Sequence, residues 1–395
     1  MRSVLVILAA VTALGQSAPQ VQLSHTTESL RGVGAVSREI AWASGTHGTY
    51  LRTTDAGRTW TPAQLPGAEA LDFRAVVAFS TDQAFLMSSG PGDQSRIYHT
   101  ADAGRHWQLQ FTSSNPKSFF DSMVFWDPTH GVVLGDPVPD EAGKLKFELL
   151  QTTDGQTWTH IPPSQLPPAV EGEAAFAASN SCLAILPATR TAGQNTGGDT
   201  NGKGATSSRA VSDRKEDRAL GPEGSDSNIW FATGGRIARV FHSSDRGRTW
   251  QVSDTPITHG PDSAGIFSIA FRDPLHGVIA GGDYKHPDQD GDNLAFTNDG
   301  GKTWTLSQIH PQAYFSALAY ARASITTRTK AVDENQANSR IFVVAPRFIF
   351  DFRPPHDPTS ISPRKKSPIQ FNAVSPYPEG GALVVGPNGS IATVP

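Results

Sequence analysis

The 395-residue sequence predicts an all-β chain folded as a seven-bladed β-propeller of four-stranded antiparallel blades. Three observations predict this fold. A short pattern built on Thr/Ser-x-Asp-x-Gly-x-Thr-Trp recurs with its Asp at 55, 102, 154, 245 and 299, so three of the four intervals are close to 50 residues, a spacing typical of propeller blades. The interval of 91 is close to one period plus an insertion. The chain holds 37 Gly and 29 Pro, as turn-rich β proteins do. Long apolar stripes with the 3.6-residue period of a helix are nearly absent.

The recurring pattern predicts a tight turn followed by a buried ring. Its Asp can accept hydrogen bonds from backbone N–H groups a few residues later, its Gly tolerates a positive φ, and its Trp begins the next strand. Each Asp is therefore expected to hold a turn rather than to catalyse a reaction. The copies are TTDAGRTW at 53–60, TADAGRHW at 100–107, SSDRGRTW at 243–250, TNDGGKTW at 297–304 and a shorter form, TTDGQTW, at 152–158.

These copies resemble the Asp-box, or BNR repeat, of sialidases and many other propellers. The resemblance implies that each copy joins the third and fourth strands of a blade, at the outer rim and away from the ligand pocket. A second repeat, FWDPTHGVVLGD at 125–136 and FRDPLHGVIAGGD at 271–283, reads as a turn between two apolar strands. Together the repeats give strand, turn, strand, loop, strand, motif and strand, which is one blade.

The blade count depends on the end of the chain. Five units carry the motif, a degenerate sixth unit spans about 312–360, and a seventh spans 370–395 and ends on the strand 390–394. That seventh unit lacks a fourth strand. We expect residues 21–27 to supply it and to close the ring, because an open propeller leaves strand edges unpaired.

Outside the blades, the sequence predicts an export signal and three insertions. Residues 1–18 combine Arg2, an apolar stretch and small residues, which predicts a signal peptide, a periplasmic or secreted protein and a propeller domain over 19–395. A polar, Gly-rich insertion at 188–227 is expected to be disordered. Shorter loop insertions are expected at 324–340 and 353–368. The single Cys182 is expected to be a buried strand residue rather than a reactive thiol.

Charge and motif content argue against several partners. The 33 basic and 37 acidic residues give a net charge of −4 and are scattered, so nucleic acid is not an expected partner. GVGAVS at 32–37 stands inside a β unit and not between a strand and a helix, so no dinucleotide cofactor is expected. We expect a monomer with no cofactor and no catalytic metal.

After the signal peptide the chain resembles the bacterial exported propellers of the photosystem II stability/assembly-factor-like family. The resemblance rests on LRGVGAVSREIAWASGTHGTYLRTTDAGRTW at 30–60, WFATGGRIARVFHSSDRGRTW at 230–250, GIFSIAFRDPLHGVIAGGDY at 265–284 and GPNGSIA at 386–392. It implies a non-catalytic scaffold that binds or assembles proteins. Members are sometimes labelled "oxidoreductase", which these residues do not support. The chain departs from the family pattern in its short third motif and in its sixth unit, where IFDFRPPHDPTS replaces a motif.

A binding site is expected on the face opposite the repeated motifs, at the central mouth, where loops between strands two and three and between blades meet. A ligand there could be a small polar molecule or a glycan. The alternative is that these side chains only cap loops and join neighbouring blades. The candidate residues are Arg96, Asp121, Asp136, Glu173, Arg239, Asp283 and Tyr284.

A glycoside hydrolase related to sialidases is the competing function. It could use Asp136 with Asp283, or Asp121 with Glu173, as its two carboxylates, although the Arg-Ile-Pro signature of sialidases is absent. The loop 283–292 carries alternating Asp residues, which we interpret as a solvated acidic loop rather than a calcium site. A basic residue precedes the Trp by two positions in four motifs; these residues are Arg58, Arg105, Arg248 and Lys302. We interpret them as a solvated edge that discourages strand pairing, and the alternative is a docking surface for an acidic partner.

Overall fold

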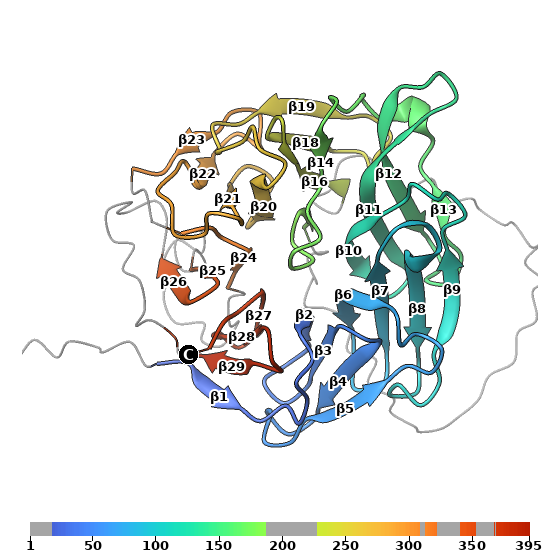
Figure 1. The fold of residues 1–395 in the computed structure, drawn as a ribbon, viewed down its shortest axis with the longest axis vertical. Coiled ribbons are helices and arrows are strands. Elements are labelled where there is room, and N and C mark those ends of the chain that lie inside the picture. The colour runs from blue at the N-terminus through green and yellow to red at the C-terminus, as the bar shows by residue number, and fades with distance from the viewer. Residues whose placement is uncertain (1–17, 187–226, 309–312, 322–339, 353–366, 368) are drawn as a thin grey trace, which may run out of the picture.

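The computed structural model describes residues 18–186, 227–308, 313–321, 340–352, 367 and 369–395. Seven β-sheets stand around a common axis, and the chain visits them in order around the ring (Figure 1). Consecutive strands within each sheet pair antiparallel, from the innermost outward. The predicted seven-bladed propeller is confirmed.

The first three blades each contain four strands and follow the predicted order. Blade 1 consists of β2 (Leu30–Ala35), β3 (Ala41–Gly45), β4 (Thr49–Thr53) and β5 (Thr61–Gln64). Blade 2 consists of β6 (Asp72–Ala78), β7 (Ala84–Ser89), β8 (Arg96–Thr100) and β9 (Gln108–Thr112), with the 3-10 turn η1 (Gly92–Gln94) between its second and third strands. Blade 3 consists of β10 (Phe120–Asp127), β11 (His130–Pro139), β12 (Leu145–Thr152) and β13 (Thr159–His160), and η2 (Pro163–Gln165) follows it.

The remaining blades show more variation. Blade 4 consists of β15 (Leu183–Ile185), β16 (Ile229–Ala232), β18 (Arg239–Ser243) and β19 (Gln251–Asp254). Blade 5 consists of β20 (Ala264–Phe271), β21 (Gly277–Asp283), β22 (Leu294–Thr297) and β23 (Thr305–Leu306), and the short strands β14 (Glu173–Ala174) and β17 (Gly234–Gly235) extend its inner edge. Blade 6 has three described strands, β24 (Ala317–Tyr320), β25 (Ile341–Ala345) and β26 (Phe348–Phe352).

Blade 7 closes the ring with a strand from the other end of the chain. It consists of β27 (Ala373–Pro376), β28 (Ala382–Val385) and β29 (Ile391–Val394), and β1 (Gln20–Gln22) pairs with β29 as the outermost strand. The predicted closing strand is therefore present, but it begins one residue earlier and ends five residues sooner than the expected 21–27. The two described ends lie together beside this blade (Figure 1).

The hydrophobic core lies between blades rather than inside a single one. In β3, Ala41 and Ala43 pack against blade 7, whereas Trp42 packs against Phe73 and Leu86 of blade 2. Both faces of such a strand are covered, so its side chains are all buried instead of alternating. The outermost strands are exposed, and this difference follows from their position at the rim.

Each repeated motif forms a loop between the third and fourth strands of its blade, which we call a repeat loop. In the first, Asp55 Oδ1 accepts the backbone N–H of Thr59 at 2.9 Å and Asp55 Oδ2 accepts its hydroxyl at 2.6 Å. Thr53 Oγ1 accepts the N–H of Gly57 at 2.9 Å. The carboxylate is thus used by its own turn, as the sequence predicts for a structural Asp.

The short third loop keeps this arrangement with one residue fewer. Ala56 and Gly57 of the first loop both have a positive φ, 63° and 75°, whereas the third loop has only Gly155 there, with φ 69°. Asp154 still accepts the N–H groups of Gln156 and Thr157 at 2.8 and 2.7 Å. The residue missing from the third loop corresponds to Ala56, the non-glycine residue that the first loop holds in the left-handed region of φ.

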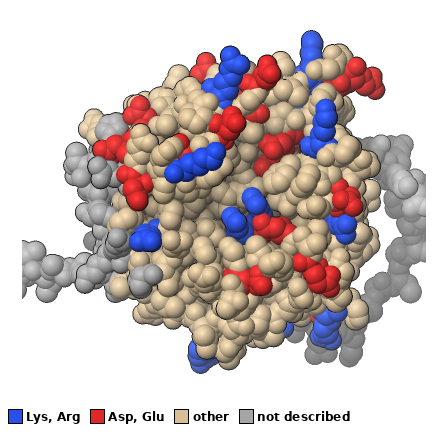
Figure 2. Space-filling model, viewed as in Figure 1, with Lys and Arg blue, Asp and Glu red and all other residues tan. Residues whose placement is uncertain are grey.

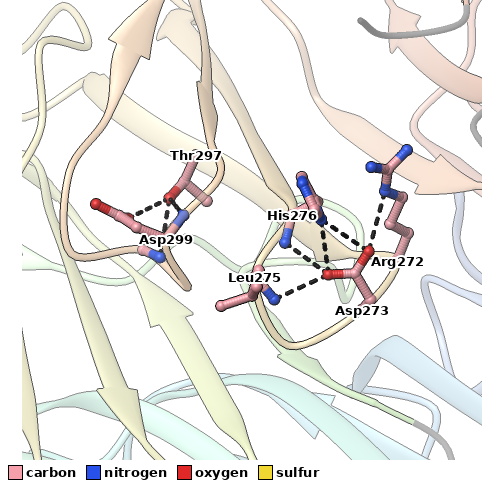
Figure 3. Close-up of polar contacts among 7 residues, drawn as sticks. Arg272, Asp273, Leu275, His276, Thr297 and Asp299 are labelled. Carbon is pink, nitrogen blue, oxygen red and sulfur yellow. Dashed lines mark hydrogen bonds and ion pairs between the residues drawn. The ribbon is translucent and has the colours of Figure 1, made fainter. Parts of the chain in front are cut away.

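Repeat loops also dock onto the turn between the first two strands of the same blade. In blade 5, Asp273 accepts the N–H groups of Leu275 and His276, both at 2.9 Å, and the nearby Asp299 belongs to the repeat loop (Figure 3). The N–H of Gly300 then donates to Leu275 O at 2.9 Å. The two turns of the blade therefore form one hydrogen-bonded unit on this face, which we call the loop face.

Glutamine side chains join neighbouring blades through the repeat loops. Gln22 of β1 accepts the indole N–H of Trp60 at 2.9 Å and donates to Ala56 O at 3.1 Å. Gln110 of β9 makes the equivalent bonds to Trp158 and to Gly155 O, at 3.0 and 2.9 Å. In both cases the outermost strand of one blade clamps the repeat loop of the next. Gln22 thus gives β1 the same role as an ordinary fourth strand.

Several sequence expectations fall wholly or mostly on residues outside the described ones. These are the signal peptide at 1–18, the disordered insertion at 188–227 and the loop insertions at 324–340 and 353–368. Cys182 is buried as expected, in the core between blades 3 and 4, but it lies just before β15 rather than in a strand.

We expect Gln22→Ala to lower the free energy of unfolding by about 1–2 kcal/mol, because the indole N–H of Trp60 loses its partner. Urea unfolding monitored by tryptophan fluorescence measures the change. Val21→Ala is the matched control on the same strand, because Val21 is 60% exposed and should be nearly neutral. Equal stability of the Gln22 variant and the wild type would contradict the clamp.

Candidate functional site

The innermost strands begin on the face opposite the repeat loops, and four charged side chains lie near those beginnings. We call this opening of the ring the mouth. Arg31 stands in β2, Asp72 and Arg74 in β6 and Asp121 in β10, in strands that are otherwise mostly apolar. Basic and acidic side chains lie close together near the centre of the face in Figure 2. The mouth is therefore a place where charges from three blades meet.

Residues 175–181, between β14 and β15, run across the mouth, and we call them the central segment. The segment lies near the middle of the ring (Figure 1). Ala177 O accepts a hydrogen bond from Arg74 of blade 2 at 3.1 Å. Ser179 donates to Ser316 O, just before the inner strand of blade 6, at 2.6 Å. Asn180 Oδ1 accepts the N–H of Met123 in blade 3 at 2.6 Å.

Aromatic stacking fixes the same segment to blade 5. The rings of Phe176 and Phe267 are stacked with centroids 4.0 Å apart, and Phe267 also contacts Tyr314 and Tyr284 edge-on. Tyr284 is 48% exposed, whereas Tyr314 is buried. The group therefore leads from the interior of the mouth to the surface and offers an aromatic contact area beside the charged residues.

Two arginines at the mouth retain unused hydrogen-bonding capacity. Arg74 donates from Nε to Asp72 Oδ2 at 2.8 Å, and its guanidinium lies 5.9 Å from the centre of the Phe119 ring. Burial, and then the neighbouring Arg74, lower the pKa of Arg31, while Asp72 and Tyr314 act in the opposite direction. Nε of Arg31 and Oδ1 of Asp72 are buried without a hydrogen-bond partner.

Asp121 and Asp136 form an electrostatically coupled pair beside this cluster. Burial, followed by the charge of Asp136, raises the pKa of Asp121 well above its usual value, although Arg74 opposes this. Burial raises the pKa of Asp136 to about 6, and the N–H of Ala175, which donates to Asp136 Oδ1 at 3.0 Å, opposes the rise. Oδ2 of Asp121 is buried and has no partner. The pair therefore holds protons at a pH where ordinary carboxyl groups have lost them.

Glu173 and Arg239, both predicted site residues, pair with each other. Arg239 donates from Nε to Glu173 Oε1 at 3.0 Å and from Nη2 to Oε2 at 2.5 Å. Thr233 and the N–H of Val170 also donate to the same carboxylate, at 2.7 and 2.8 Å. The Glu173 carboxylate therefore receives all four of these hydrogen bonds from the protein itself. These two residues anchor the strand that leads into the central segment.

Two other predicted site residues, Arg96 and Asp283, bond within their own loops. Arg96 donates to Asp93 O at 2.5 Å and so bonds to its own loop. Asp283 Oδ2 bonds to Nδ1 of His286 at 2.8 Å. The structure thus couples Asp121 with Asp136 and engages Glu173 and Asp283 elsewhere. The Asp121–Asp136 pair therefore differs from both carboxylate pairs that the sequence suggests for glycoside hydrolysis.

Sequence reasoning missed Arg31, Asp72, Arg74 and the central segment. A usable signal was present, because the innermost strand of each blade borders the ring axis and a charged residue stands out in so apolar a strand. Within the described residues, no three His, Cys, Asp or Glu side chains are grouped so as to hold a metal ion, and this includes the acidic loop 283–292. No helix among the described residues is long and apolar enough to span a bilayer.

The fold and its mouth define a closed seven-bladed β-propeller with a charged and aromatic opening at one end of its axis. A solved structure described as "YCF48 bound to D1 peptide" superposes with a TM-score of 0.57 over 97% of this chain and 98% of that chain, at 12% identity. The WD40 propeller domain of Doa1 gives a TM-score of 0.53 over 96% and 97%, at 10% identity. At these identities the likeness concerns the fold.

A curated protein adds a short similarity in sequence. The chloroplastic photosystem II stability/assembly factor HCF136 of Arabidopsis thaliana is 35% identical over 66 residues, which cover 16% of this chain. The match spans 15% of the length of that relative. No family model matches the chain. The chain is thus similar in fold to the YCF48 and Doa1 propellers and, over a short stretch, similar in sequence to HCF136.

We expect Asp121→Asn to stabilise the protein at pH 8 by on the order of 1–3 kcal/mol. The folded state raises the pKa of Asp121 above its unfolded value near 3.8, so wild-type stability falls as pH rises above about 4. The advantage of the variant should therefore disappear below that pH. Urea unfolding at pH 3.5 and pH 8 measures it.

Asp283→Asn is a control for which the expected change in stability at neutral pH has the opposite sign. Burial raises the pKa of Asp283, but the hydrogen bonds from His286, Ser263 and Lys285 outweigh that effect and lower it. This variant should lose stability at neutral pH and approach the wild type in acid. A destabilised Asp121 variant at pH 8 would contradict the assignment of the buried pair.

Proposed function

We propose that the protein is an exported propeller that binds a protein partner at its mouth and serves as a binding or assembly scaffold. The observation that carries this proposal is the combination of Arg31, Arg74 and the exposed Tyr284 at one end of the axis. Arginine and tyrosine dominate the energetically important centres of protein interfaces, because they join a large contact area to directional hydrogen bonds.

Similar proteins support a protein partner. The YCF48 structure of the same fold is described as bound to a D1 peptide, and HCF136 is described as a photosystem II stability and assembly factor. A peptide segment is a chemically suitable occupant of the mouth. Its carbonyl or carboxylate oxygens could accept from the arginines while an apolar side chain rests on the aromatic group.

The loop face is the alternative docking surface. Its basic residues are exposed and belong to repeat loops of four different blades; they are Arg58, Arg105, Arg248 and Lys302. Arg58 is partly engaged, because its Nε donates to Asp55 O at 3.0 Å. Exposed charges contribute little affinity individually, which favours the mouth over this face.

We expect Tyr284→Ala to reduce recovery of the partner at least fivefold, in keeping with the loss of a central interface contact. Cross-linking in the periplasm of the source organism, followed by affinity capture and quantitative mass spectrometry, measures recovery. Leu109→Ala is the matched control, because Leu109 is also 48% exposed but lies on the outer strand β9.

A second variant distinguishes binding at the mouth from binding at the loop face. The triple variant Arg58→Ala, Arg105→Ala, Arg248→Ala should retain the partner. Loss of the partner with this variant but not with Tyr284→Ala would move the binding surface to the loop face and overturn the mouth as the site.

Export is proposed from the apolar stretch and small residues at 1–18. We expect the mature chain to begin between residues 16 and 19 and to appear in the periplasm or the medium. Cell fractionation with N-terminal sequencing measures this. An intact Met1 in the cytoplasmic fraction would refute export.

A further inference from the structure

Four of the five repeat loops receive a hydrogen bond from the preceding blade. In each case a side chain of that blade donates to a backbone carbonyl of the loop, so the bond joins the two blades. The donor and acceptor pairs are Gln22 with Ala56 O, Tyr50 with Gly104 O, Gln110 with Gly155 O and Ser253 with Gly301 O, at 3.1, 2.8, 2.9 and 2.6 Å. A hydrogen-bonded clamp from blade to loop is therefore the usual device at these junctions.

The repeat loop of blade 4 is the exception. Its carbonyl at Gly247, which corresponds to those of Gly104 and Gly301, accepts the indole N–H of Trp250 from the same loop at 3.0 Å. Among the described residues, no side chain of blade 3 donates a hydrogen bond to this loop. The outer strand of blade 3, β13, has only two residues, whereas β9, which carries Gln110, has five. Blade 3 therefore has less outer strand from which such a donor could come.

An arginine of this loop makes the contact with blade 3 instead. Arg246 lies between the Asp and the Gly of the motif, where blades 1 and 2 have Ala56 and Ala103. Its guanidinium carbon lies over the ring of Trp126, in β10 of blade 3, at 5.2 Å from the ring centre. Trp126 in turn packs against the core between blades 3 and 4. The contact runs from the loop to the preceding blade, which is the reverse of the other four.

The turn itself gives no reason for an arginine at this position. Arg246 has a φ of 60°, in the left-handed region that glycine occupies at least cost, and blade 5 has Gly300 there with a φ of 82°. A long side chain held in this region is uncommon and persists where surrounding contacts fix it. The contact with Trp126 is of this kind, so the side chain rather than the backbone accounts for the arginine.

We propose that Arg246 is a lock for the junction between blades 3 and 4: its guanidinium, placed over Trp126, replaces the hydrogen-bonded clamp and keeps the loop-face end of this junction closed. The central segment belongs to the connection between the same two blades and crosses the mouth at the other end of the axis. The lock and the central segment therefore lie at opposite ends of one junction. No partner takes part in the lock, so it stands apart from the proposed function.

The chemistry of the two side chains suits this role. An indole face attracts a cation more strongly than the other aromatic rings do, and arginine is the cation found most often over such faces. A guanidinium group is planar and weakly hydrated, whereas the ammonium group of lysine is compact and strongly hydrated. Arg246→Lys therefore keeps the charge but not the planar contact, and we expect it to preserve only part of the lock.

Hydrogen exchange of the full-length chain, measured by mass spectrometry on peptides from the repeat loops, tests the lock. We expect Arg246→Ala to raise the opening constant of a peptide covering 243–250 about two- to fivefold, the loss expected for a cation over an aromatic ring near the surface. The loop at 53–60, which blade 7 clamps through Gln22, should not change. Arg248→Ala is the matched control, an exposed arginine of the same loop, and should leave the 243–250 peptide unchanged.

Variants of Trp126 test whether this ring is the other half of the lock. In a Trp126→Leu background, Arg246→Ala should have no further effect, because the ring is already absent. Trp126→Phe keeps a ring and should retain a smaller effect, which provides the test if the Leu variant does not fold. The lock is refuted by unchanged exchange in Arg246→Ala, by an equal rise at 53–60, or by the same fold-change in the Trp126→Leu background. Full protection in Arg246→Lys would contradict the planar contact as its basis.

Discussion

The clamp between the outer strand of one blade and the repeat loop of the next is the interaction on which the ring depends. A blade has both faces apolar and is stable only when neighbours cover them, so the position of each blade relative to the next must be fixed. At two junctions, blade 7 to blade 1 and blade 2 to blade 3, Gln22 and Gln110 fix it by bonding to a tryptophan indole and a loop carbonyl at once. The Asp of each loop makes this possible, since it holds the turn rigid from inside.

Ring closure also creates the mouth. Arg31, Arg74 and Asp121 come from three successive blades and meet because their strands are innermost. The central segment then crosses the opening and contacts blades 2, 3, 5 and 6. It belongs to the connection between blades 3 and 4. An ordinary inter-blade connection has thus become a structural element at the ring axis.

The charges at the mouth are costly for the fold. Asp121 is buried with an unpartnered oxygen, and burial and a second arginine depress the pKa of Arg31. Nothing in propeller packing requires these groups, because apolar residues fill the same positions in other blades. Glu173 and Arg239 show the contrasting case, since every bond they make serves the chain itself. Of the buried side-chain atoms without a hydrogen-bond partner among the described residues, three belong to Arg31, Asp72 and Asp121, and others, including Trp107 Nε1 and Trp304 Nε1, lie at the repeat loops.

The sequence by itself determined the fold class, the blade number, the structural role of Asp55 and its counterparts, and the closure by an N-terminal strand. These features follow from local turn chemistry and from a repeat period, and both are readable along the chain. The tertiary structure decided which charges meet. Asp121 couples to Asp136 rather than to Glu173, and Arg96 stays with its own loop while Arg31 and Arg74 reach the axis. Such contacts join residues far apart in the chain, and only the closed ring sets their distances.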